Sequence, residues 1–160
     1  MARIRTKIGD VFSVPLDNIN KKYFQYIAND LTQLNSDVIR AFVKRYPIDA
    51  VPDLLDVVRD DVDFHAHVVI KWGIEMNTWE KVGTAPYLER LDVLFRDSKD
   101  YGKQIKTSYN WRVWRINEKF QSIGKLDGDY QKAEIGIVVA PPNLVQRMRT
   151  GEYGFVYPGY

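Results

Sequence analysis

The sequence contains no cysteine and no long apolar run, and each absence excludes a class of protein. Without cysteine there can be no disulfide framework, no thiolate metal site and no cysteine nucleophile. No apolar stretch approaches the roughly 20 residues that a membrane-spanning helix needs, so no membrane partner is expected. The basic start MARIRTK is not followed by an apolar signal core. We therefore expect a cytoplasmic protein.

The chain also lacks a large excess of charge of either sign. Its 23 lysine and arginine residues against 21 aspartate and glutamate residues leave a formal net charge of +2, too small to indicate nucleic-acid binding by itself. No linker rich in glycine, serine or proline divides the sequence, so a single domain over residues 1–160 is expected. Aromatic residues make up 13%, and together with many valines and isoleucines they favour strands.

The alternation of apolar and polar residues predicts strands along most of the chain. Those over residues 9–16 and 23–30 are expected to pair as an opening hairpin, because LDNINKK between them is typical of a turn. Further strands are predicted over residues 37–46, 64–72, 78–83, 91–96, 110–124 (two strands joined by a turn at Asn117–Glu118) and 133–140.

Helical spacing of apolar residues replaces this alternation in two short segments. Over residues 51–60, Pro52 suits the first helical position and Asp53 suits the positive end of the helix dipole. Over residues 142–150 a second helix is expected to end at Gly151. The prediction is an α+β fold, in which a strongly bent antiparallel sheet or a partly open barrel packs with two short helices. The expected core includes Val11, Phe12, Val14, Ile27, Phe42, Val69, Trp72, Trp79, Val82, Ile123, Ile135, Ile137 and Val139.

The stretch IDAVPDLLDVVRDDVDFHAH (48–67) is rich in charge of one sign, with six aspartates between Asp49 and Asp63. On a helix, like charges three or four residues apart repel by about 0.2–0.5 kcal/mol per pair, so the cluster adds little stability. It is either an ordinary solvated helix face or an acidic patch that steers and docks a cationic partner, such as a basic nuclease. On the second interpretation, the partner-facing residues are Asp53, Asp56, Asp60 and Asp61, with Tyr46 as an aromatic anchor.

A second candidate surface is the segment YNWRVWRINEKF, which lies within a basic stretch over residues 99–119. Aromatic rings interleaved with arginines are able to stack on bases and neutralise phosphates. The alternative is a strand with one buried aromatic face and one solvated arginine face. The residues of this nucleic-acid hypothesis are Trp111, Arg112, Trp114 and Arg115.

The only two histidines, His65 and His67, stand two residues apart, so a strand would place both on one face. A hydrolytic metal site would need a third ligand, for which Asp61 or Asp63 is near in sequence. The alternative is the polar face of an ordinary strand. The sequence contains no G-x-S-x-G, G-x-x-x-x-G-K or H-E-x-x-H motif. No metal, no cofactor and no enzymatic activity are therefore expected.

Three short motifs resemble the immunity protein 26 family of bacteria: KIGDVFSVPLDN (7–18), YFQYIA (23–28) and NTWEKVGTAP (77–86). The resemblance covers roughly residues 1–95 and transfers no catalytic residue. It implies a cytoplasmic, non-enzymatic antitoxin of a polymorphic toxin system, whose partner is a cognate protein toxin. The aspartate cluster would suit a toxin of basic character. Residues 1–97 are then expected to form an immunity-like sheet core. Residues 98–160 have no counterpart in the family and are expected either to elaborate the same sheet or to form a second small subdomain.

Overall fold

The structure is a computed structural model that describes residues 5–86 and 92–160. Its α-helices are α1 (Leu54–Val58), α2 (Ile70–Glu75) and α3 (Pro141–Thr150), with a 3-10 turn η1 (Gly128–Lys132). Its strands are β1 (Asp10–Pro15), β2 (Asn20–Asp30), β3 (Ser36–Phe42), β4 (Tyr46–Pro47), β5 (Val62–Val68), β6 (Glu80–Thr84), β7 (Leu94–Ser98), β8 (Trp111–Arg115), β9 (Gln121–Gly124), β10 (Glu134–Ile135) and β11 (Val138–Val139).

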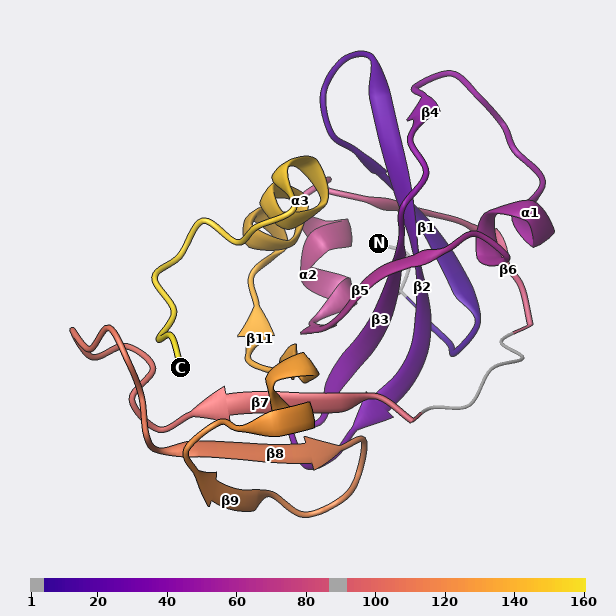
Figure 1. The fold of residues 1–160 in the computed structure, drawn as a ribbon. Coiled ribbons are helices and arrows are strands. Elements are labelled where there is room, and N and C mark those ends of the chain that lie inside the picture. Colours follow the sequence, from indigo (N-terminus) through magenta and orange to yellow (C-terminus); the bar gives the residue numbers. More distant parts are fainter. Residues whose placement is uncertain (1–4, 87–91) are drawn as a thin grey trace.

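The strands form two sheets, and the smaller sheet lies across one end of the larger (Figure 1). The larger sheet has the order β11-β5-β3-β2-β1-β6, with β4 paired to β2, and the smaller has the order β10-β7-β8-β9. The predicted α+β class is confirmed, and neither sheet closes into a barrel. Pairing is antiparallel except for β11 beside β5 and β10 beside β7, which are parallel.

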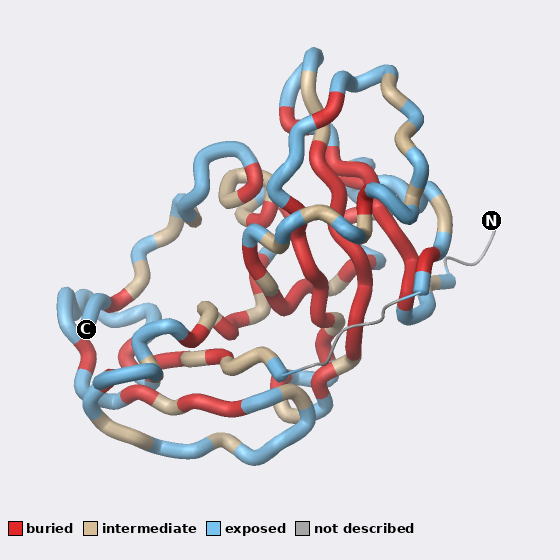
Figure 2. Tube along the Cα trace, turned by 45° about the vertical axis from the view of Figure 1, so that its right-hand side comes forward, coloured by how far each residue is buried: buried red, intermediate tan, exposed pale blue. Residues whose placement is uncertain are grey.

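Most of the larger sheet is buried on both faces, with α1 packed on part of one face and α2 and α3 on the other, while the edge strand β6 stays largely exposed. Successive residues of a strand point to opposite faces. Val11 accordingly packs in a cluster with Val57 of α1, whereas Phe12 packs in a cluster with Leu144 of α3. Strands β1, β2 and β3 are therefore buried along most of their length (Figure 2). The helices α2 and α3 lie beside each other in Figure 1 and share the second of these clusters.

Both predicted helices form, and the first is shorter than predicted. The first begins at Leu54, because the side chain of Asp53 accepts a hydrogen bond from Leu55 N and caps it. The last ends at Gly151 as predicted, with φ of 88° in the left-handed region. None of the helices in the described ranges is long and apolar enough to cross a membrane.

A third α-helix, α2, replaces the end of the strand predicted over residues 64–72. Its first turn is fixed from a neighbouring strand, since the carboxylate of Asp37 accepts a hydrogen bond from Ile70 N at 3.0 Å. Its Gly73 lies against the indole of Trp79, where a Cβ would be 2.0 Å from ring atoms. The helix turns Trp72 outward, so its prediction as a core residue is wrong.

The rest of the predicted core is largely confirmed. Val82 is the other exception and is exposed, because β6 is an edge strand of the larger sheet. Three further residues are half-buried: Val69, Ile123 and Ile135. Eight are buried as predicted: Val11, Phe12, Val14, Ile27, Phe42, Trp79, Ile137 and Val139.

The strand predicted over residues 133–140 is divided between the two sheets. Its first half, β10, pairs with β7 of the smaller sheet, and its second half, β11, pairs with β5 of the larger. Between them, Gly136 passes so close to Trp114 that a Cβ would lie 2.4 Å from a ring atom. This crossing brings β5, β7 and α3 together around one cavity.

Candidate functional site

The predicted acidic patch lies on the segment that carries β4 and α1, here called the acidic surface and defined as residues 43–61. Two of its carboxylates accept hydrogen bonds from backbone N–H groups and so stabilise the local structure. Asp53 caps α1 through Leu55 N at 2.9 Å, and Asp60 accepts a hydrogen bond from Lys44 N at 2.7 Å. The side chains of Asp56 and Asp61 are exposed and bond to no residue in the described ranges, so they remain available to a partner.

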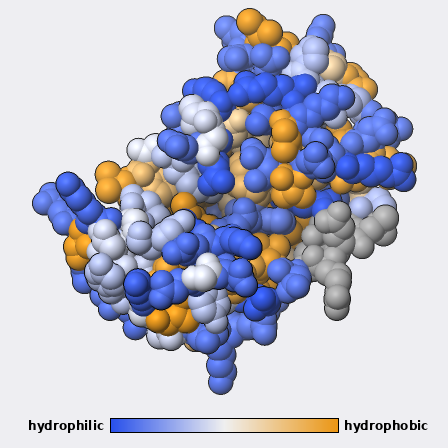
Figure 3. Space-filling model, viewed as in Figure 1, coloured by the Kyte–Doolittle hydropathy of each residue, from blue (hydrophilic) through white to orange (hydrophobic). Residues whose placement is uncertain are grey.

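Apolar side chains are exposed on the same surface, which the sequence interpretation did not anticipate. Val51 is 95% exposed, and three more are at least one-third exposed: Val43, Ile48 and Leu55. Figure 3 shows hydrophobic residues interspersed among hydrophilic ones over the region of β4 and α1. Single exposed apolar residues are ordinary, but a group of them beside charged residues is typical of a contact surface.

Tyr46 is not available as an aromatic anchor, and this part of the prediction is corrected. Its ring is buried in the cluster beneath α1 and meets Tyr23 edge-on with centroids 5.3 Å apart. Burial raises the pKa of the Tyr46 hydroxyl, and the carboxylates of Asp60 and Asp56 add to the effect. Tyr46 therefore supports the acidic surface from below rather than contacting a partner.

The nucleic-acid hypothesis fails at the rings that would stack on bases. Trp111 and Trp114 are 1% and 2% exposed, and each donates its indole N–H inside the protein. Arg112 pairs with Asp97 at 3.1 Å, and Arg115 pairs with Asp92 at 2.9 Å. The alternative interpretation of this segment, a strand with one buried aromatic face, is the one that the structure has.

His67 is part of a buried network where the two sheets meet. Its Nε2 lies 2.8 Å from Asp30 Oδ2, and Trp114 donates to the same oxygen at 2.9 Å. Burial alone would raise the pKa of Asp30, but hydrogen bonds from His67, Asn117 N and Trp114 outweigh it and lower the pKa to about 2. The Nδ1 atom of His67 is buried and has no hydrogen-bond partner among the described residues.

His65 has a different partner, so the two histidines do not form one centre. Its backbone N and its Nδ1 both contact Glu134 Oε2, at 2.8 and 2.5 Å. Within residues 5–86 and 92–160, no group of three or more histidine, aspartate or glutamate side chains is arranged to hold a metal ion. Asp63, one of the suggested third ligands, instead pairs with Lys22 at 3.7 Å.

A polar cavity of about 180 Å³ lies beside His65, and sequence reasoning missed it. We call it the arginine cavity. Its walls come from β5, β7, β10 and α3, and its lining residues are His65, Arg96, Lys132, Ala133, Glu134, Ile135 and Arg147. These residues come from four separate segments, so no local motif could have indicated them. The only sequence signal was the predicted strand over residues 133–140, which places Glu134 in a sheet.

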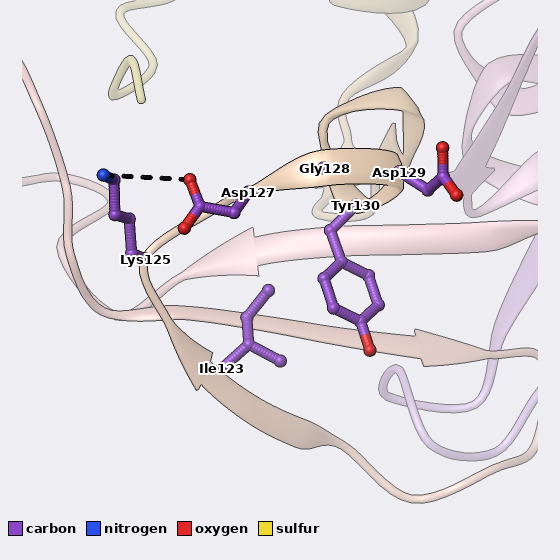
Figure 4. A pocket seen from close by; sticks show the side chains of 6 residues that line it. All are labelled: Ile123, Lys125, Asp127, Gly128, Asp129 and Tyr130. Carbon is purple, nitrogen blue, oxygen red and sulfur yellow. Dashed lines mark ion pairs between the residues drawn. The ribbon is translucent and has the colours of Figure 1, made fainter.

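A wider hollow of about 610 Å³ lies at the edge of the smaller sheet, between the end of β9 and η1. Figure 4 shows Ile123 and Tyr130 along it and the ion pair between Lys125 and Asp127, whose charged atoms are 3.8 Å apart. Both members of this pair are largely exposed and neutralise each other, so the hollow offers no fixed charge to a ligand.

Comparison of the chain with models of protein families, with curated proteins and with solved structures gives no significant match. The motifs that resemble the immunity family therefore have to be judged by their place in the fold. Gly9 has φ of 103°, and a Cβ there would lie 2.9 Å from Ala85 O. Asp10 is fully buried and accepts hydrogen bonds from Lys7 N and Thr84 Oγ1. These motif positions determine the turn and the core of the sheet.

Proposed function

We propose that the chain is a non-enzymatic immunity-type protein, which binds and neutralises a basic bacterial toxin domain through the acidic surface. The observation that carries the proposal is the combination, on one exposed segment, of apolar side chains with carboxylates that bond to no described residue. Stable protein interfaces bury apolar groups at their centre and place charged groups at their rim. In this proposal, the chain binds the toxin in the bacterial cytoplasm.

The two kinds of side chain have separate roles in this proposal. Asp56 and Asp61 attract a cationic partner and speed its association, an effect that salt screens. Val51 and Leu55 lose water on binding and slow dissociation, because burying apolar area gives about 25 cal/mol per Å². The segment is presented on a sheet buried on both faces, so little order has to be gained on binding.

The test uses the toxin domain that this proposal expects to be encoded beside the chain, expressed in a bacterial host together with variants of the chain. A charge variant carries Asp56→Asn and Asp61→Asn, and an apolar variant carries Val51→Ser and Leu55→Ser. Neither touches Asp53 or Asp60, whose carboxylates hold backbone groups. The matched control removes two exposed carboxylates elsewhere, with Glu75→Gln and Glu118→Gln.

The expected result is that the wild type and the control restore growth and bind the toxin domain, while both surface variants protect poorly. By surface plasmon resonance, the charge variant should associate more slowly and respond less to salt, and the apolar variant should dissociate faster. If both surface variants protected as well as the control, the acidic surface would be the wrong interface. If the wild type neither bound the toxin domain nor restored growth, the immunity function itself would be refuted.

A further inference from the structure

Positive charge is concentrated in the arginine cavity beyond what its own carboxylate balances. Arg96, Arg147 and Lys132 line it, whereas Glu134 is the one carboxylate among its lining residues. Lys132 stands at the rim, where it pairs with Asp129 at 3.4 Å and both side chains are more than four-fifths exposed. The two arginines are therefore the charges that the fold itself holds in place.

The guanidinium of Arg147 is held by rings rather than by acids. It lies 4.5 Å from the ring centroid of Phe64 and 5.0 Å from that of Tyr153. It makes no hydrogen bond or ion pair with any residue in the described ranges, and its Nε is buried without a partner. Ring contacts fix the plane of a guanidinium but leave its N–H groups unsatisfied. A buried donor without an acceptor is costly, so these donors favour an acceptor from outside the chain.

Arg96 lines the same cavity and is also held without an acid partner among the described residues. One of its terminal nitrogens, NH1, donates to the carbonyls of Gln131 and Ala133, while its Nε is buried and has no partner among the described residues. Burial lowers the pKa of Arg96 from its usual range; Arg147 lowers it further, while Tyr157, Tyr160 and Glu134 act in the opposite direction. Two like charges in a partly buried site repel each other, and an anion between them would relieve that repulsion.

The single carboxylate of the cavity is already engaged. Both nitrogen contacts of His65 reach the same oxygen of Glu134, Oε2, from its backbone N at 2.8 Å and its Nδ1 at 2.5 Å. Because an ionised carboxylate accepts, His65 Nδ1 donates in this pair. The other imidazole nitrogen, Nε2, makes no hydrogen bond within the described ranges. Glu134 thus orients His65 through Oε2, and neither of its oxygens accepts a hydrogen bond from Arg96 or Arg147 among the described contacts.

We propose that the arginine cavity binds a phosphoryl group, either free phosphate or the terminal group of a small phosphomonoester. A phosphoryl group has a charge of about −1.5 to −2 and three acceptor oxygens, which suits two guanidinium forks better than a single carboxylate would. The volume of about 180 Å³ is below the roughly 300–1,000 Å³ of sites for drug-sized ligands, so the enclosed part of the ligand is small. No residue of the acidic surface lines the cavity, and this proposal does not rest on the proposed function.

The test is isothermal titration calorimetry with inorganic phosphate, at an ionic strength held constant with sodium chloride. The wild type should give a saturable one-site isotherm. Arg147→Gln should weaken binding about 10- to 100-fold, as expected for the loss of charged hydrogen bonds. Arg115→Gln is the matched control: it removes an arginine from β8 that pairs with Asp92 outside the cavity, and it should bind as the wild type does.

Two further variants separate loss of binding from loss of fold. Arg147→Lys keeps the charge but not the fork, so its affinity should fall between those of the wild type and Arg147→Gln. Glu134→Gln keeps an oxygen that can accept from His65 but removes a negative charge, so it should bind phosphate more tightly. A gain in affinity is a result that structural damage would not produce.

The source of the phosphoryl group is distinguished by a second titration with ribose 5-phosphate. Tighter binding of the ester indicates a group carried by a larger molecule, whereas binding of phosphate alone indicates the free ion. The proposal is overturned if phosphate gives no saturable heat, if sodium chloride alone reproduces the effect, or if Arg147→Gln and Glu134→Gln both bind as the wild type does.

Discussion

At the acidic surface, Asp56 and Asp61 extend into solvent, and the carboxylates with partners hold backbone N–H groups of their own segment. In the arginine cavity, Arg96 and Arg147 are half-buried, stacked on rings and without an acid partner in the described ranges. Exposed charges are screened and act mainly on the approach of a partner. Buried ones act strongly at short range, but only while the surrounding fold holds them in place.

Because of this difference, amino-acid substitutions should have different effects in the two regions. The acidic surface depends on a helix of five residues and a few local hydrogen bonds, so substitutions there should change binding more than stability. The arginine cavity exists only because two sheets meet, so substitutions at their junction should change stability and anion binding together.

The largest effect is expected at Asp30, which accepts four hydrogen bonds at the junction, from Thr32 N, His67, Trp114 and Asn117 N. Asp30→Ala leaves these donors without an acceptor, and the free energy of unfolding should fall by about 3–5 kcal/mol. Urea denaturation measures the loss. Asp49→Ala, at an exposed position of the acidic surface, is the control and should change stability by less than about 0.5 kcal/mol. A loss at Asp30 no larger than at Asp49 would contradict the contrast.

The same residue gives the junction a characteristic response to acid. Because the pKa of Asp30 is lowered from 3.8 to about 2 in the folded protein, its carboxylate stabilises the fold fully above pH about 4. That contribution should be lost as the pH falls from about 4 to about 2. Asp30→Ala should lack this part of the acid sensitivity, and the slopes of stability against pH for the two proteins would then differ only in this range.

A smaller effect is expected at Gly136, where the chain crosses from one sheet to the other. Gly136→Ala would place a methyl group 2.4 Å from the ring of Trp114, and overpacking of this kind costs about 1–3 kcal/mol. Phosphate affinity should fall with it, because a shift of β10 would move the neighbouring carbonyl of Ala133, which holds Arg96, while toxin binding should be unchanged. Gly154→Ala is the control, since its Cβ would meet only the side chain of Gln146 at 3.6 Å. Equal melting temperatures for the two variants would exclude a tight crossing.

The contrast also explains which features the sequence could predict. Signals that act within a few residues were found: an aspartate at the start of α1, the end of α3 at Gly151 and the acidic segment itself. Pro52, predicted as the first helical residue, instead lies before the cap at Asp53. The helix α2 was missed because its stability comes from Trp79 and Asp37, which lie outside it. The split at residues 136–137 was missed because the apolar residues of a single predicted strand do not record which sheet each half joins, and Gly136 alone did not reveal the break.

The candidate sites follow the same division. The acidic surface is contiguous in sequence, so its charges could be identified, but the burial of Tyr46 depends on Tyr23 of another strand. The arginine cavity combines single residues from segments as far apart as His65 and Arg147, each of which is unremarkable in its local pattern. Prediction from local pattern therefore favours exposed sites over enclosed ones.

The smallest effect separates two aspartates of the acidic surface that have the same charge and different duties. Asp53→Ala removes the cap of α1 and should cost about 1 kcal/mol, whereas Asp56→Ala should change stability by less than about 0.5 kcal/mol. Each variant removes one negative charge from the same side of the molecule, so each should slow association with a basic toxin domain to a similar extent at low salt. Urea denaturation measures the first quantity, and stopped-flow association at two salt concentrations measures the second.

These two measurements together determine what the aspartates contribute. If the two variants differ in stability but associate at equal rates, the cap stabilises the helix and the charges act on the partner only through long-range electrostatic attraction. Slower association for Asp53→Ala alone would mean that the partner recognises the folded shape of α1, because only that variant loosens the helix. Equal stability for both would show that the 2.9 Å contact between Asp53 and Leu55 N does not hold the helix, and the acidic surface would then be ordered by Tyr46 and its neighbours beneath it.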